Sequence, residues 1–357
     1  MFQPKTAIFR QVTLYESIPM KNYILLLLIP IIFACSNKEQ RQESLIQKGY
    51  QSLEQGQEKQ AFNYFESAID INEENASAWN GLGVAHYQNG HPYEAVQAFN
   101  KAVQYKPDYT RAYYNRSNAF YQTGEYYRAL DDLEPVLEDY QDSAFAHMAH
   151  GLALVGLENY PEAKISFDKA LSLNPENAEI HTNLAAVDYY QKNNEAAVIH
   201  LENALKLNPE EANAWNLLAL IQSEQELYES ALESVNKALK LQPGQPYFLN
   251  NKGYILTFMG KYEQAYEDLR KSIVRDENNP YVYRNLGILA LKQKDYEEAI
   301  RQFENAYKRK SDLASLNYYR GEAFRLSDEM DKACEAYKKS QELEEEKGIK
   351  AYQQFCK

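Results

Sequence analysis

The chain has 357 residues, of which 25% are charged, and its formal net charge at pH 7 is −13. A surface this acidic repels nucleic acid and anionic membranes, so we expect neither as a direct partner. The charge suits either a basic partner segment or solubility alone.

Residues 1–34 differ in character from the rest and are interpreted as an upstream extension followed by a signal peptide. Met20 and Lys21 precede an apolar run from Tyr23 to Ala34. The run is too short to span a bilayer. A positive start, a short apolar run and a small residue at its end are typical of a secretory signal.

The sequence Ile32-Phe33-Ala34-Cys35 resembles a bacterial lipobox. The resemblance implies cleavage before Cys35 and attachment of lipid to it, so that residues 35–41 form a lipidated cysteine and a short polar tether. Ser36 follows, rather than the Asp that often marks inner-membrane retention. We therefore expect a lipid-anchored protein of the bacterial cell envelope, at the outer membrane and facing the periplasm. The alternative is an ordinary signal peptide with an incidental cysteine.

From residue 42 to residue 347 the sequence repeats every 34 residues. One position holds alanine in all nine copies: Ala61, Ala95, Ala129, Ala163, Ala197, Ala231, Ala265, Ala299 and Ala333. A second is always small: Gly49, Gly83, Ser117, Gly151, Ala185, Ala219, Gly253, Gly287 and Gly321. A third is always large and apolar: Phe65, Phe99, Leu133, Phe167, Leu201, Val235, Leu269, Phe303 and Tyr337. We expect the small residues where the two helices of a hairpin cross and the large ones between hairpins.

Residues 76–109 show the unit most clearly, with Trp79, Leu82 and Gly83 on a first helix, Phe99 on a second, and Pro107 at the close. This pattern resembles the tetratricopeptide repeat. The resemblance implies an all-α superhelical solenoid of nine hairpins, with first helices on the concave side. In five copies the leucine position is basic or histidine: Lys48, Arg116, His150, Lys252 and Arg320. Their stems are expected to cover apolar surface while their heads reach water.

Residues 348–357 are expected to form an amphipathic helix that caps the last hairpin. Cys334 lies on the final second helix and Cys356 near the end of this cap. In an oxidising compartment two such cysteines favour a disulfide, with two free buried thiols as the alternative.

The concave groove is the predicted binding site, because tyrosine and asparagine recur at first-helix positions that should face it. Asparagine amides can hold an extended peptide backbone, and tyrosine rings add contact with a polar tip. The arrangement resembles the asparagine-lined superhelices of peptide-binding repeat proteins, not the carboxylate clamp of chaperone-binding repeats. The alternative is that these residues merely suit solvated helix faces. The candidates are Arg111, Tyr114, Asn115, Asn118, Tyr121, Asn183, Tyr189, Tyr247, Asn250, Asn251, Tyr254, Tyr281, Arg284 and Asn285. In the fourth repeat Phe145, Met148 and Leu152 predict either an apolar binding spot or tighter self-packing.

The sequence carries no phosphate-binding loop, no Cys-x-x-Cys and no His-Glu-x-x-His, so we expect no catalysis, metal, cofactor or small-molecule substrate. His147 and His181 share a repeat column with Trp79 and Trp215 and are interpreted as packing residues. The predicted function is an envelope scaffold that binds other proteins. Two alternatives remain: a pilot or assembly factor for a secretion or pilus apparatus, and an accessory regulator of a peptidoglycan enzyme.

Overall fold

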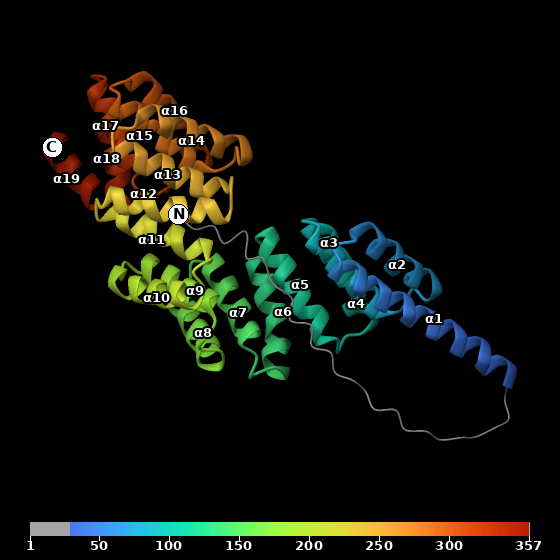
Figure 1. Ribbon diagram of the computed structural model, residues 1–357. Coiled ribbons are helices and arrows are strands. Elements are labelled where there is room, and N and C mark those ends of the chain that lie inside the picture. Colours follow the sequence, from blue (N-terminus) through green and yellow to red (C-terminus); the bar gives the residue numbers. More distant parts are fainter. Residues whose placement is uncertain (1–28, 357) are drawn as a thin grey trace. The chain divides into compact units, whose positions relative to one another are not determined.

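The computed structural model describes residues 29–356, with side chains from Asn37 onward. Nineteen α-helices fill this range, and each odd-numbered helix packs most closely against the even-numbered helix that follows it (Figure 1). The predicted all-α fold of stacked hairpins is therefore confirmed. The chain divides into two compact units, one up to Glu176 and one from Asn177.

The first unit contains four hairpins. Its helices are α1 (Ile29–Glu54), α2 (Glu58–Ile71), α3 (Ala76–Gln88), α4 (Pro92–Tyr105), α5 (Thr110–Thr123), α6 (Tyr126–Asp139), α7 (Ala144–Gly156) and α8 (Tyr160–Leu173). Residues 36–41, expected as a tether, belong to the backbone of α1. The signal segment 1–28 lies outside the described residues, as does the side chain of Cys35.

The second unit contains five hairpins and a last helix. Its helices are α9 (Ala178–Tyr190), α10 (Asn194–Leu207), α11 (Ala212–Glu224), α12 (Tyr228–Leu241), α13 (Pro246–Phe258), α14 (Tyr262–Arg275), α15 (Pro280–Lys292), α16 (Tyr296–Arg309), α17 (Leu316–Leu326), α18 (Met330–Glu342) and α19 (Glu346–Phe355). Among the helices of residues 29–356, none is long and apolar enough to cross a membrane.

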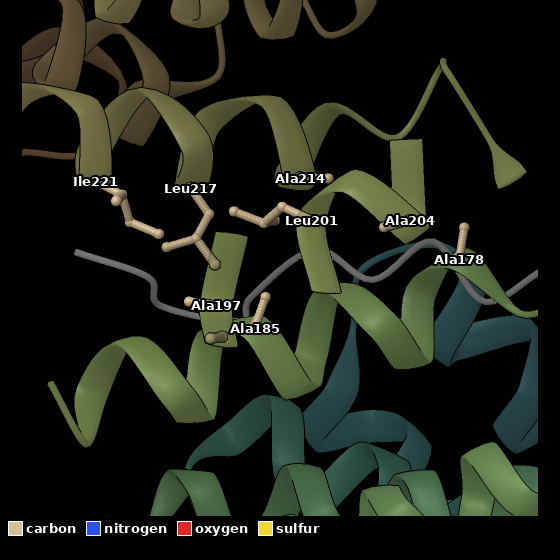
Figure 2. Close-up of a cluster of buried hydrophobic side chains, with 9 residues drawn as sticks. Ala178, Ala185, Ala197, Leu201, Ala204, Ala214, Leu217 and Ile221 are labelled. Atoms are coloured by element: carbon tan, nitrogen blue, oxygen red, sulfur yellow. The ribbon is translucent and has the colours of Figure 1, made fainter. Parts of the chain in front are cut away.

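The small and large repeat positions meet inside the hairpins. In the fifth repeat Ala185 of α9 lies beside Ala197 of α10, and Leu201 points toward Leu217 of the next hairpin (Figure 2). In the first repeat the ring of Phe65 fills the space against both Gly49 and Gly81, where an added methyl group would collide with it. The large residue thus packs within its own hairpin as well as between hairpins, which extends the prediction.

The turn inside each hairpin places one residue in the left-handed region of the backbone. The same repeat position has a positive φ in all nine copies: Gly56, Gly90, Gly124, Glu158, Lys192, Glu226, Gly260, Lys294 and Asp328. Only four of these are glycine, the residue that adopts this conformation without a steric cost. The backbone geometry is therefore kept even where the side chain opposes it.

The loops between hairpins are tied by the fourth residue of the first helix. Trp79 Nε1 donates to the carbonyl of Glu73 at 2.7 Å, and Trp215 Nε1 donates to that of Pro209 at 2.8 Å. His147 Nε2 lies 2.9 Å from the carbonyl of Gln141, in the same six-residue relationship. Because a carbonyl can only accept, Nε2 of His147 carries the proton. His147, interpreted from the sequence as a packing residue, thus ties its loop as the two tryptophans do.

Two of the basic residues at the leucine position, Arg116 and Lys252, are held differently from the prediction, whereas Lys48 is exposed as expected. Arg116 meets Asp132 of the same hairpin at 2.6 Å, with only 15% and 6% of the two side chains exposed. Lys252 lies 3.3 Å from Asp268, also within its own hairpin. In these copies the charged heads end in ion pairs rather than in water, because the partner helix supplies a carboxylate one turn from the hairpin crossing.

The C-terminal helix α19 packs on α18 as the predicted cap, and Ala351 is buried against it. Cys334 and Cys356 form a disulfide with their Cα atoms 5.5 Å apart. Phe355 lies over Tyr337, the large apolar residue of the ninth repeat. The cap thus covers the last hairpin both covalently and by aromatic packing.

Candidate partner-binding face

Within each unit the odd-numbered helices contact one another, whereas the even-numbered helices of residues 29–356 make no such mutual contacts. Side-by-side packing of the odd helices makes theirs the shorter, inner side of each stack. We call the surface they present the inner face. All fourteen groove candidates lie on odd-numbered helices, as the resemblance implied.

Asparagines on this face bond to one another rather than standing free. In the second unit Asn251 Nδ2 donates to Asn216 Oδ1 and Asn285 Nδ2 donates to Asn250 Oδ1, both at 2.9 Å. These four residues are at most 5% exposed. In the first unit Asn115 Nδ2 donates to Asn80 Oδ1 at 2.9 Å. Each bond joins residues 35 apart on consecutive first helices, and we call the set the asparagine ladder.

The ladder corrects the prediction for Asn115, Asn250, Asn251 and Asn285. Their amides were expected to hold a peptide backbone. A buried amide must find partners inside the protein, and here the neighbouring helix supplies them. Asn183 differs: its Nδ2 is buried and has no hydrogen-bond partner among the described residues.

The other candidates separate by exposure. Tyr121 and Tyr281 are each 7% exposed and belong to the packed interior. Arg111 is exposed, whereas Tyr114 and Asn118 are partly buried. Tyr247 is partly buried, and its hydroxyl donates to Asp276 at 3.2 Å. In the fourth repeat Met148 and Leu152 are buried, so their apolar side chains serve self-packing rather than a binding spot.

Three candidates come together on the inner face of the second unit with residues that the sequence analysis missed. Tyr254 packs against Phe258 with ring centroids 4.8 Å apart, and Tyr228 stacks on Phe258 at 5.6 Å. The hydroxyl of Tyr189 donates to Glu224. We call Tyr189, Tyr228, Tyr254, Phe258, Arg284 and Tyr319 the tyrosine site.

The hydroxyls of this site share one electrostatic environment. Burial is the main cause that raises the pKa of Tyr189, Tyr254 and Tyr319, and the charge of Arg284 opposes the rise at each of them. Two of these rings, Tyr254 and Tyr319, also pack against one apolar cluster together with Phe258. All three phenols stay protonated at neutral pH and can donate hydrogen bonds.

The repeat positions of the additional site residues could have been used to predict them. Tyr319 occupies the ninth-repeat copy of the position that holds Asn251 and Asn285. The prediction included those two asparagines but not the tyrosine. Glu224 and Phe258 are the last residues of α11 and α13, one position beyond the predicted groove set. Tyr228 begins a second helix and reaches the inner side from there.

In the described part of the chain, no group of three or more histidine, cysteine or acidic side chains is arranged to hold a metal ion. His181 Nδ1 lies 3.2 Å from His200 Nδ1 across the hairpin α9–α10. His200 Nε2 is 3.7 Å from Asp188, which is 1% exposed. His181 is 9% exposed, in keeping with its interpretation as a packing residue.

Family models match several parts of the chain. Three tetratricopeptide repeat models match residues 76–109, 154–221 and 284–345. The chain is a tetratricopeptide repeat protein. A model of the tetratricopeptide repeat domain of cytochrome c-type biogenesis protein H matches residues 198–310. No curated protein sequence matches the chain.

Two solved structures with TM-scores above 0.6 share the fold. A chain of the APC/C hetero-tetramer Cut9–Hcn1 aligns with a TM-score of 0.64 at 14% identity, over 84% of this chain and 59% of the other. The human IFIT1 dimer with PPP-AAAA gives 0.61 at 16% identity, over 85% and 77%. PilF of Pseudomonas aeruginosa gives 0.46 at 24% identity, over 61% and 98%. For the first two structures, at 14% and 16% identity, the likeness concerns the fold alone.

Proposed function

We propose that this tetratricopeptide repeat protein is an envelope scaffold that binds a polypeptide segment of another protein across the inner face of its second unit. Tetratricopeptide repeat proteins bind protein partners, and no catalytic constellation stands out in the sequence. The tyrosine site carries the proposal. Partly buried aromatic rings with polar tips give a large contact area at low cost in side-chain entropy.

The second part of the proposal is the anchor at Cys35 in the outer membrane, facing the periplasm. It rests on the lipobox-like sequence and on the signal-like run before it. Mass spectrometry of the mature N-terminus tests it, with Cys35→Ala as the comparison. An N-terminal Cys35 carrying acyl chains is expected. An unmodified Cys35, or a mature chain that starts elsewhere, would overturn the anchor.

Among the narrower roles, an assembly function has one specific observation in its favour. The model of the cytochrome c-type biogenesis protein H domain covers residues 198–310, which contain Tyr228, Tyr254, Phe258 and Arg284. A scaffold that holds a client polypeptide while it is assembled would use such a face. A pilot role or the regulation of a peptidoglycan enzyme would require a dedicated partner at the same surface.

The binding proposal is tested by comparing proteins that co-purify from solubilised membranes with three forms of the full chain. The inner-face variant is Tyr254→Ala with Tyr319→Ala, and the control is Tyr266→Ala on α14, where the side chain is 56% exposed. A partner lost from the inner-face variant and kept by the control supports the proposal. A partner kept equally by both folded variants contradicts it and points to the outer helices or the loops.

A further inference from the structure

Arg284 differs from other partly buried arginines of this protein in what surrounds its charge. Arg116, Arg320 and Arg325 each meet a carboxylate at 2.6 to 2.8 Å. No carboxylate of the described residues lies within 4.0 Å of the Arg284 guanidinium, which has only neutral oxygens as partners. Partly buried charges are ordinarily paired, so an arginine held without a counter-ion has capacity for an external one.

The guanidinium is also fixed in place. Its Nε and Nη2 donate to Asn285 Oδ1 at 3.2 and 3.1 Å, and its Nη1 donates to the carbonyl of Ala314 at 2.9 Å. Asn285 is in turn held by Asn250 through the asparagine ladder. A guanidinium has five N–H groups, so both terminal nitrogens keep a free donor. Because the group is already oriented, a ligand would not have to order it.

The surroundings add further donors and apolar walls. The hydroxyls of Tyr254 and Tyr319 make no hydrogen bond to any described residue. Unlike the hydroxyls of Tyr189 and Tyr247, which have partners, they are left for solvent or a ligand, since neither is a fully buried unpaired atom. Since their raised pKa keeps them protonated, both can donate to an acceptor beside Arg284. The ring of Phe258 lies between Tyr254 and Tyr228, in contact with both, and the three rings offer an apolar surface.

We propose that the tyrosine site binds a segment of the partner protein that carries a carboxylate next to an aromatic or aliphatic side chain, with Arg284 taking the carboxylate. The inference rests on the proposed function and names the chemistry of its ligand. Arg284 offers the opposite charge to an acid at short range, where it counts most, although the net charge is −13 and the Glu224 carboxylate is held by Tyr189 in the same site. The basic residues at this site, Arg284 and the Lys292 that lies 5.0 Å above the ring of Phe258, both come from α15 rather than from adjacent helices.

A library of random twelve-residue peptides displayed on phage tests the inference, with the full mature chain as bait. Selected peptides should be enriched in Asp or Glu beside an aromatic or aliphatic residue. A synthetic copy of the best peptide should bind at least tenfold more weakly when its acid is replaced by the amide. Copies with a free or an amidated C-terminus distinguish a chain-terminal carboxylate from a side-chain one.

Three variants of the protein complete the test. Arg284→Gln keeps amide donors and removes the charge, and it should lose the preference for acid over amide. Tyr319→Phe removes only a hydroxyl and should weaken acidic peptides severalfold with unchanged helicity. Arg270→Gln removes an equal charge from the exposed side of α14 and should bind like the unaltered protein.

The outcomes separate the two levels of the proposal. Peptides without acids, or acidic peptides that bind Arg284→Gln and Tyr319→Phe as before, overturn the inference. If the selected peptides of either kind still bind more weakly to the variant Tyr254→Ala with Tyr319→Ala, the inner face remains the binding surface. If they do not, or if no peptide is selected, the proposed function fails together with the inference.

Discussion

Gly287 of α15 lies directly under the ring of Phe303 in α16, and a methyl group added to Gly287 would come within 2.5 Å of the ring carbons. The other hairpins show the same relationship with compensating sizes. Wherever the large position is aromatic the small position is glycine, whereas Ala185 faces Leu201 and Ala219 faces Val235. Volume at these crossings is therefore largely compensated between the two positions, with Gly253 opposite Leu269 as an exception.

Gly287→Ala should destabilise the second unit by about 1–3 kcal/mol, because the buried ring cannot move away without overpacking its neighbours. Adding Phe303→Leu should recover part of the loss by restoring a combination the chain uses in its fifth repeat. Thermal denaturation followed by calorimetry measures both. A single variant as stable as the original would show that the ring relaxes freely, contrary to the close packing described.

Lys294→Gly should stabilise the protein by about 0.5–1 kcal/mol, because it removes the steric cost of a side chain at a φ of 65°. The gain is limited by the greater freedom of glycine in the unfolded chain. Gly260→Ala, at the same repeat position, should destabilise by a similar amount. Chemical denaturation of the two variants checks the pair, and a loss of stability in Lys294→Gly would refute the argument.

Asn251→Ala should destabilise the protein by roughly 1–3 kcal/mol, since it removes the bonds that Asn251 makes to the buried Asn216 Oδ1 and Asn250 Nδ2. The exposed Asn236 on α12 gives the matched control, and Asn236→Ala should change stability by less than about 0.5 kcal/mol. Urea unfolding curves compare the two. Equal curves for both variants would mean that the asparagine ladder contributes nothing measurable.

Stability should fall as pH rises from about 5 to about 8. Partial burial, with a smaller contribution from the Glu211 carboxylate, raises the pKa of Glu179 to about 7 from its usual 4.5. Between these values the folded state binds a proton that the unfolded state has lost, so stability is present below about 4.5 and lost through 7. Burial also raises the pKa of Glu211, which acts in the same direction. Glu179→Gln should flatten the profile of melting temperature against pH, and an unaltered profile would count against this assignment.

Reduction of the Cys334–Cys356 disulfide, or Cys356→Ser, should cost about 3 kcal/mol of stability in the terminal hairpin, because the bridge closes a loop between residues 22 apart. Hydrogen exchange should show the loss in α18 and α19 and leave α9 to α11 protected. Two titratable thiols in oxidised, unfolded protein would exclude the bridge altogether.

The fold could be predicted from the sequence because 34-residue spacing fixes which residues share a helix face, and the alanine and glycine positions leave little choice of packing. The left-handed turns could not be predicted in full, since Glu158 and Lys192 have no local reason to adopt a positive φ. The repeat imposes that conformation on them from both flanking helices.

The candidate site was predicted only in part. Period and helix face placed Tyr254 and Arg284 correctly on the inner side, but they do not say whether a polar side chain faces solvent or the next helix. Asn251 and Tyr254 are three residues apart on α13, yet the first is buried in the asparagine ladder and the second lies in the tyrosine site. That difference depends on whether the residue 35 positions away on the neighbouring helix can form a hydrogen bond. The sequence of a single repeat does not contain this information.

The asparagine ladder has a mechanical consequence. Pulling the ends of the second unit apart would separate its odd-numbered helices from one another. Each separation would break the hydrogen bonds between the two neighbouring helices. The seams α11–α13 and α13–α15 each carry such a bond, from Asn251 and from Asn285. Under tension α11, α13 and α15 should therefore stay together as one stiff block. The neighbouring pairs of odd-numbered helices in the unit that lack an asparagine pair should separate first.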